Sequence, residues 1–232
     1  MSSYKGHTLF ALILSILYFQ NPLLISLSII GANLPDFDHK LKKDNVYKMI
    51  IFGLSLFIIL YILKLPYYIG IILVIIGLIF YFSNHRGFTH SIFGLIILTS
   101  LFSGILILSF ELVNSYLDIS NKSLIFAILI ILIGTFSLNK KLYLFFVPLF
   151  LISIFFFNID SINYFQIILS IFLGYFSHLI LDAFTPAGVK LFRPFSNKKY
   201  YKKFAITSLL ILIIIGFLNL YFQFNSIENI LI

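Results

Sequence analysis

The sequence predicts an all-α fold: a polytopic transmembrane helical bundle of about seven full spans plus an N-terminal re-entrant helical hairpin. Hydrophobic residues make up 61% of the 232 residues and charged residues only 10%, whereas a soluble domain carries roughly 25% charged residues. The hydrophobic residues form runs separated by short polar breaks, without strand-like alternation, and backbone groups in lipid must be satisfied internally. We therefore expect one integral membrane domain over residues 1–232.

The first apolar stretch, Thr8–Ala32, is either one long span or two short helices. It contains Asn21-Pro22, and proline removes a backbone donor and disfavours helix at the residue before it. The two-helix alternative gives Thr8–Phe19 and Leu23–Ala32, which would form the hairpin.

The later apolar runs are each expected to span the membrane. Several are short for a hydrocarbon core of about 30 Å, so tilt or local thinning is expected. The expected spans are Met49–Leu63, Tyr67–Phe82, Ile92–Phe110, Leu124–Ser137, Leu142–Phe156, Tyr164–Phe184 and Ala205–Phe222.

Basic residues predict an orientation. If Pro35–Lys48 is cytoplasmic and the spans alternate, 13 of the 16 basic residues lie inside, as the positive-inside rule requires. These are Lys40, Lys42, Lys43, Lys48, Arg86, Lys140, Lys141, Lys190, Arg193, Lys198, Lys199, Lys202 and Lys203.

The same rule accounts for the net charge of +8, so membrane lipid and not nucleic acid is the expected partner. The expected location is the cell (inner) membrane, multi-pass, with the loops that carry the polar motifs facing the cytoplasm; the sequence gives no oligomeric state.

Five histidines mark the polar clusters at the ends of apolar runs. In the predicted topology the clusters around His39, His85 and His178 lie at the cytoplasmic level, and His7 joins them only if Thr8–Ala32 is a hairpin. Because the chain has no cysteine, any metal must be held by nitrogen and oxygen ligands. The expected ligands are His7, Asp36, His85, His90, His178 and Asp182. Their number is larger than the four ligands of one tetrahedral metal, so the site is expected to hold two metals, or one metal with supporting residues.

His178 and Asp182 are four residues apart in a helical run, so they share one face. Ionisable residues at the end of an apolar span usually mark function; the alternative is a neutral histidine bonded to a carboxylate for helix packing. His85 and His90 flank Gly87, where a turn could bring both rings to one point.

The planar guanidinium group of Arg86 is suited to bind a phosphate or a carboxylate through paired hydrogen bonds. Asp36 and Asp38 follow Pro35, and we expect one to be a ligand and the other a supporting residue. His39 is interpreted as part of the solvated basic run beside it.

Three motifs together resemble the YdjM-like family of inner-membrane proteins, a family described as metal-dependent hydrolases. They are Leu34-Pro35-Asp36-Phe37-Asp38-His39, His85-Arg86-Gly87-Phe88-Thr89-His90-Ser91, and the run from Gly174 through His178, Asp182, Thr185, Pro186 and Gly188.

The family is distantly similar to zinc-dependent phospholipase C and to nucleases of the P1 type, whose helical His-x-x-x-Asp pair would correspond to His178 and Asp182. By the same resemblance, Asp36 would match their early aspartate and His7 their N-terminal histidine. Their His-x-x-x-Glu pattern is absent from this sequence, so a trinuclear site is not expected.

The expected function is a membrane-embedded metal-dependent hydrolase that acts on a phosphoester or ester of a lipid or lipid-linked substrate at the cytoplasmic interface. The cofactor is expected to be a divalent metal, zinc first and manganese second. Asp38, or else Asp36, would orient or deprotonate a metal-bound water, while Arg86 and Arg193 would bind an anionic group of the substrate. The alternatives are a non-enzymatic metal-binding protein, serving as a sensor or partner scaffold, and a metal transporter.

Overall fold

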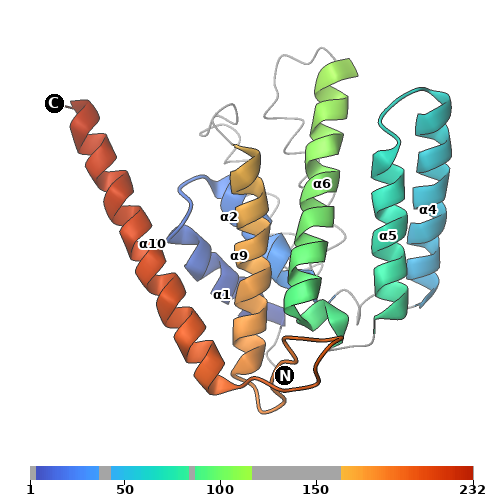
Figure 1. Cartoon of the computed structure of the whole chain (residues 1–232). Coiled ribbons are helices and arrows are strands. Elements are labelled where there is room, and N and C mark those ends of the chain that lie inside the picture. The colour runs from blue at the N-terminus through green and yellow to red at the C-terminus, as the bar shows by residue number, and fades with distance from the viewer. Residues whose placement is uncertain (1–3, 37–42, 84–86, 117–162, 232) are drawn as a thin grey trace.

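The computed structural model describes residues 4–36, 43–83, 87–116 and 163–231, and helices account for most of them (Figure 1). The helices are α1 (Tyr4–Ile16), α2 (Pro22–Asn33), α4 (Lys43–Ile62), α5 (Tyr68–Phe82), α6 (Ile92–Tyr116), α9 (Tyr164–Ala183) and α10 (Lys202–Leu231), with a short 3-10 turn η1 (Phe88–His90). The predicted all-α class is confirmed, and within these residues the only β pairing is an isolated bridge between Val189 and Tyr200.

The prediction of about seven full spans is wrong. Three described helices are long and apolar enough to cross a membrane: Ile92–Ser115, Tyr164–Ala183 and Lys202–Phe222. The apolar parts of α4 and α5, Val46–Ile62 and Tyr68–Phe82, are shorter. At about 1.5 Å per residue they reach roughly 22 to 26 Å, less than the hydrocarbon core of about 30 Å. The expected spans Leu124–Ser137 and Leu142–Phe156 lie outside the described residues.

Two short helices occupy the first apolar stretch, so the single-span alternative is wrong. α1 ends at Ile16 and α2 begins at Pro22. Asn21 caps α2 by accepting a hydrogen bond from the backbone N–H of Leu23 at 2.9 Å, and Pro22 takes the first helical position, where a missing N–H costs nothing.

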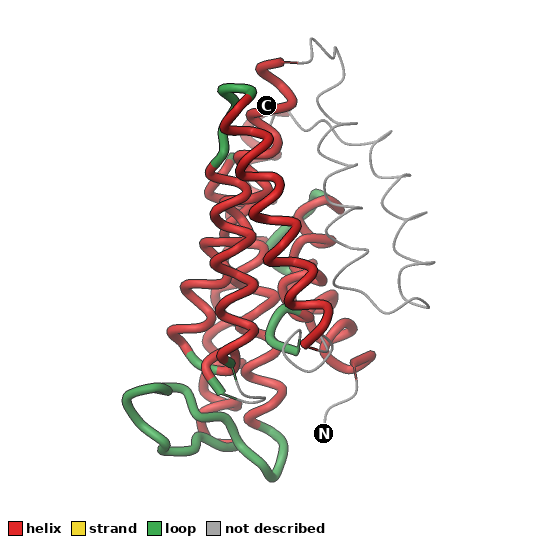
Figure 2. Tube along the Cα trace, turned by 90° about the vertical axis from the view of Figure 1, so that its right-hand side faces the viewer, coloured by secondary structure: helices red, strands yellow, loops and turns green. Residues whose placement is uncertain are grey.

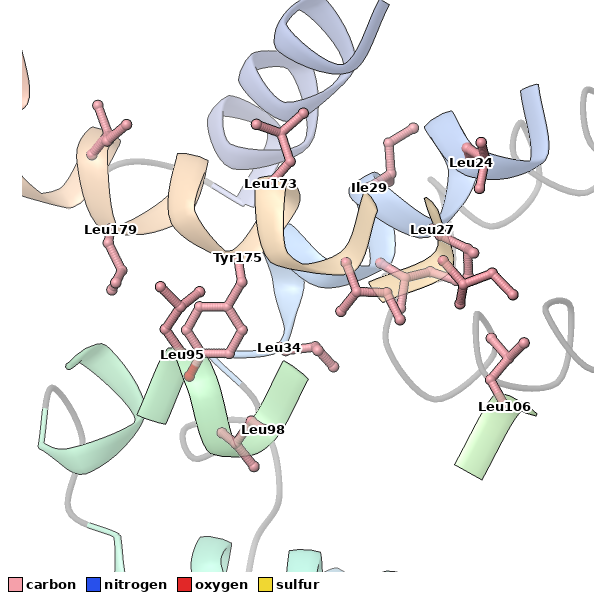
Figure 3. Close-up of a cluster of buried hydrophobic side chains, with 14 of the residues drawn as sticks. Leu24, Leu27, Ile29, Leu34, Leu95, Leu98, Leu106, Leu173, Tyr175 and Leu179 are labelled. Carbon is pink, nitrogen blue, oxygen red and sulfur yellow. The ribbon is translucent and has the colours of Figure 1, made fainter. Parts of the chain in front are cut away.

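α2 and α9 pack directly against each other at the centre of the molecule. A Cβ on Gly174 would overlap the backbone oxygen of Ser28, and one on Gly31 would overlap that of Ile171, so glycine permits the close approach. Leucines and Tyr175 from α9, α2 and α6 fill the space around this contact (Figure 3). The central pair therefore depends on two residues without side chains.

The remaining helices surround this pair. α4 and α5 form an antiparallel hairpin beside α6, and α10 leans away from α9 on the other side (Figure 1). Only 11% of the apolar window of α10 is buried, and most of its isoleucines and phenylalanines are exposed, as expected of a helix that faces lipid.

The N-terminus, the start of α6, the end of α9 and the start of α10 lie at one end of the molecule (Figure 1). The loop between α9 and α10 extends beyond the helix ends there (Figure 2). This end, called the motif end below, carries the described polar motifs.

Candidate metal centre

His178 and Asp182 form the centre of a polar cluster near the end of α9. Both are buried, and they lie one helical turn apart with Nε2 of His178 at 3.6 Å from Oδ2 of Asp182. Nδ1 of His178 bonds the backbone oxygen of Ala32 at the end of α2, at 2.7 Å. Because a carbonyl only accepts, Nδ1 carries a proton, and in the neutral ring Nε2 keeps its lone pair. This is the arrangement typical of a histidine that ligates a metal.

The chain that follows α2 brings Asp36 to the same point. Its Oδ1 lies 3.5 Å from Nε2 of His90 and 3.8 Å from Nε2 of His178. Its side chain is 22% exposed, against 5% or less for the other four members of the cluster, so Asp36 lies at the edge. Burial alone would raise the pKa of the Asp36 carboxyl, but contact with His90 and the neighbouring imidazoles outweighs burial and lowers it to about 2. The carboxylate is therefore ionised at neutral pH, the form that binds cations.

The turn η1 supplies His90, and Ser91 starts the helix that follows. The hydroxyl of Ser91 accepts a hydrogen bond from the backbone N–H of Gly94 at 3.1 Å, which caps α6. Nε2 of His90 lies 3.4 Å from Nε2 of His178 and 3.6 Å from Oδ2 of Asp182. Its Nδ1 pairs with the hydroxyl of Thr89 at 3.1 Å, which leaves Nε2 to face the cluster.

α1 contributes His7 to the cluster. The ring of His7 stacks on that of His178, with centroids 3.7 Å apart and planes 12° apart, and its Nε2 lies 3.5 Å from Oδ1 of Asp182. Asn33 at the end of α2 donates a hydrogen bond to the hydroxyl of Thr8 at 3.4 Å, which ties α1 to α2 beside the cluster.

The five side chains fit a metal. Two overlapping groups, His7 with Asp36 and His178, and His90 with His178 and Asp182, each place their ligand atoms within 4.8 Å of one another. The pairs measured above lie 3.4 to 3.8 Å apart, close to the roughly 3.3–3.6 Å expected between tetrahedral ligands at about 2.0–2.2 Å from one ion. Three imidazoles and two carboxylates could therefore hold a divalent metal.

A cavity of about 220 Å³ adjoins this cluster. Two candidate ligands, His90 and Asp182, line it together with the basic residues Lys190, Arg193 and Lys199. The loop after α9 shapes this lining through the Val189–Tyr200 bridge, whose two backbone hydrogen bonds measure 2.9 and 2.8 Å.

The structure thus brings together five of the six ligands expected from the sequence: His7, Asp36, His90, His178 and Asp182. Their role as ligands stays a prediction. Arg193, expected to bind a substrate anion, lines the adjoining cavity. His85, Asp38 and Arg86 lie outside the described residues.

Sequence reasoning missed the supporting groups. Lys190 and Lys199 were not among the site residues expected from the sequence. Tyr175, buried on α9, donates a hydrogen bond to the backbone oxygen of Thr89 and so fixes η1 against α9. No sequence pattern marks a tyrosine whose partner is a backbone carbonyl 86 residues away.

Replacing Tyr175 by phenylalanine is expected to weaken divalent-metal binding by about 10–100-fold, because His90 loses its fixed position. Metal titration of the purified variant measures this. Tyr18→Phe is the matched control, since Tyr18 donates to the backbone oxygen of Leu212 at 2.6 Å between α1 and α10. Equal loss of metal affinity in both variants would show that Tyr175 has only a general role in stability.

A family model described as YdjM inner membrane protein matches residues 1–231. No curated protein and no solved structure matches the chain, so the distant similarity to phospholipase C and nucleases of the P1 type stays a prediction. The match covers nearly the whole chain, and the three long apolar helices agree with a membrane location. The chain belongs to the YdjM inner membrane protein family.

Proposed function

We propose that this protein is a metal-dependent hydrolase, built into the membrane by several helices, with its site at the cytoplasmic interface. One observation carries the proposal: two candidate ligands, His90 and Asp182, line a cavity that basic side chains also line. A structural metal site is closed by its protein ligands, whereas a catalytic one keeps a position open to water or substrate. A ligand cluster that opens into a cavity supports the catalytic alternative over a sensor or scaffold.

The donor set supports zinc as the metal, with manganese second. Neutral imidazole and carboxylate suit zinc and similar first-row metals, and the chain offers no thiolate. A divalent metal would supply a bound water with a pKa of about 7 and polarise the bond to be cleaved. Asp36, Asp182 and the imidazole nitrogens would hold that metal. The backbone oxygen of Ala32 and the hydroxyl of Thr89 would orient two of the imidazoles.

The catalytic residues of the proposal are Asp38 and Arg86. Asp38 follows the ligand Asp36 by two residues, so it would orient the attacking water and accept its proton. Arg86 would bind an anionic group of the substrate through its planar fork, and Arg193 would do so from the cavity wall.

The membrane location supports a lipid or lipid-linked substrate. The cluster lies where α9 ends and α6 begins, two helices long enough to span a membrane. A site at the end of spanning helices lies at headgroup level. The excess of lysine and arginine in the loop after α9, which includes Lys190, Arg193 and Lys199, supports a cytoplasmic position for the motif end.

Hydrolysis by purified, metal-loaded protein tests the proposal. The wild type is expected to cleave members of a panel of lipid phosphoesters and carboxylic esters. Asp38→Asn should lower kcat by about 10²–10⁴-fold, the usual contribution of a general base, without loss of bound metal. Asp44→Asn is the matched control, since it makes the same change at the start of α4.

A metal-loaded wild type that cleaves nothing in the panel would contradict the hydrolase proposal. Retention of full activity by Asp38→Asn would contradict the role given to Asp38 while leaving hydrolysis itself in place.

A further inference from the structure

Three basic residues line the cavity beside the metal centre. They are Lys190, Arg193 and Lys199, and in the described part of the chain none of them forms an ion pair with a carboxylate. Lys190 and Arg193 are half-buried, and a partly desolvated cation without a counter-ion is costly. Asp182, the carboxylate of the cavity, is directed to His7, His90 and His178. Among the described residues these three cations have no carboxylate partner, so an anion that enters the cavity would neutralise them.

Backbone pairing brings the main chains of two of these residues side by side. Val189 and Tyr200 bond to each other in an antiparallel bridge, and Lys190 and Lys199 are the residues that come next on the two sides of that bridge. They thus occupy positions directly opposite each other, where like charges destabilise antiparallel pairing. The backbone N–H of Ile92 also bonds the oxygen of Leu191 at 2.8 Å, which fastens this loop to the start of α6.

Loop geometry holds the third cation beside them. The backbone N–H of Arg193 bonds the oxygen of Lys190 at 3.3 Å, so the chain turns between the two residues. A guanidinium fork next to two ammonium groups is suited to the several oxygens of a phosphate. A repulsive arrangement built by main-chain hydrogen bonds is favourable once such an anion occupies it.

The size of the cavity limits what it takes. At about 220 Å³ it is smaller than the roughly 300–1,000 Å³ of pockets that enclose drug-sized ligands. It therefore admits one small polar group and leaves the rest of a larger molecule outside. Three cations match the charge of about −1.5 to −2 on a terminal phosphate at pH 7 better than the single charge of a phosphodiester.

We propose that Lys190, Arg193 and Lys199 form the binding site for the terminal phosphate of a phosphate monoester. This inference rests on the proposed function, and it names the substrate class: a phosphomonoester and not a carboxylic ester or phosphodiester. In the reaction a water oxygen attacks phosphorus, the phosphorus–oxygen bond to the alcohol breaks, and the leaving oxygen takes a proton. The products are the free alcohol and inorganic phosphate.

Phosphate binding tests the site directly. Titration calorimetry of inorganic phosphate into metal-loaded, full-length protein compares the wild type with the double variant Lys190→Gln/Lys199→Gln. We expect the variant to bind phosphate at least about tenfold more weakly, because charge-assisted hydrogen bonds are lost. Its metal content should be unchanged. Lys202→Gln/Lys203→Gln is the matched control: it removes the same charge from the start of α10, outside the cavity. An equal loss in both doubles, or no phosphate binding by the wild type, would overturn the proposal.

Two further binding measurements distinguish a soluble phosphomonoester from a lipid one. Glycerol 3-phosphate in solution is compared with phosphatidic acid in vesicles, and phosphatidylglycerol vesicles supply an anionic phosphodiester. Preference for either monoester over phosphatidylglycerol supports the site, and the preferred monoester shows whether the source is soluble or lipid. Equal binding of phosphatidylglycerol would overturn the choice of a monoester.

The outcomes for binding and for hydrolysis are distinguishable. Phosphate binding that depends on Lys190 and Lys199, with no hydrolysis of any substrate, would uphold this site and contradict the hydrolase. Hydrolysis of carboxylic esters without phosphate binding would uphold the hydrolase and overturn this site.

Discussion

Replacing His178 or Asp182 by alanine is expected to remove the metal from the protein. Wild type purified in detergent should carry near-stoichiometric zinc or manganese, and each variant should fall below about a tenth of that content. Loss of a supporting hydrogen bond alone costs about 10–100-fold in affinity, and these two residues contact more of the cluster than any supporting group. His178 lies within 3.8 Å of His90, Asp36 and Asp182. Elemental analysis measures the content directly.

Ser177→Ala is the control for this pair of variants. Ser177 is buried on α9 next to His178, and its hydroxyl donates only within the helix, to the backbone oxygen of Gly174 at 2.6 Å. Its metal content should equal that of the wild type. If the wild type holds no metal after zinc and manganese have been offered, the polar cluster serves helix packing and the hydrolase proposal fails.

Replacing Gly174 by alanine is expected to destabilise the protein by at least about 3 kcal/mol, at the upper end of the usual cost of overpacking. The added Cβ would overlap the backbone oxygen of Ser28, and a backbone atom cannot rotate away as a flexible side chain can. α2 and α9 would have to separate, which also moves the backbone oxygen of Ala32 away from His178. Thermal unfolding in detergent, followed with metal content, should show both falling together.

Gly104→Ala is the matched control on α6. The nearest atom to a Cβ there is Cδ1 of Ile72 at 3.8 Å, an ordinary contact. Alanine is about 1 kcal/mol better than glycine inside a helix, so this variant should be as stable as the wild type or slightly more so. A Gly174→Ala protein as stable as Gly104→Ala would show that α2 and α9 do not pack as closely as described.

Local patterns were enough to predict several parts of the fold and the site. Pro22 separates two helices because its ring disfavours a helical conformation at the residue before it, a constraint that acts between neighbours in sequence. His178 and Asp182 share a face because they are four residues apart. The grouping of His7 with Asp36, His90 and His178 followed from a predicted topology that places every polar cluster at the same side of the membrane.

The remaining features depend on the lengths of the helices and on contacts between residues that are far apart in sequence. The count of spans failed because apolar composition alone does not give a helix the length to cross a bilayer, as α4 and α5 show. The backbone oxygen of Ala32, which fixes the tautomer of His178, has no side chain that a motif could reveal. The facing positions of Lys190 and Lys199 depend on the Val189–Tyr200 bridge, and neither residue lies in a periodic pattern.

The stacking of His7 on His178 has a consequence for the order of assembly. A chain is synthesised from its N-terminus, so α1 and α2 are made before α9, and the ring of His178 on which His7 stacks does not yet exist at that stage. Contacts between residues so far apart in sequence form late and slowly. A metal bound at the proposed centre would therefore secure α1 against α9 only after both are in place. A nascent chain that stops before α9 would lack His178 and Asp182, and with them part of each candidate ligand group.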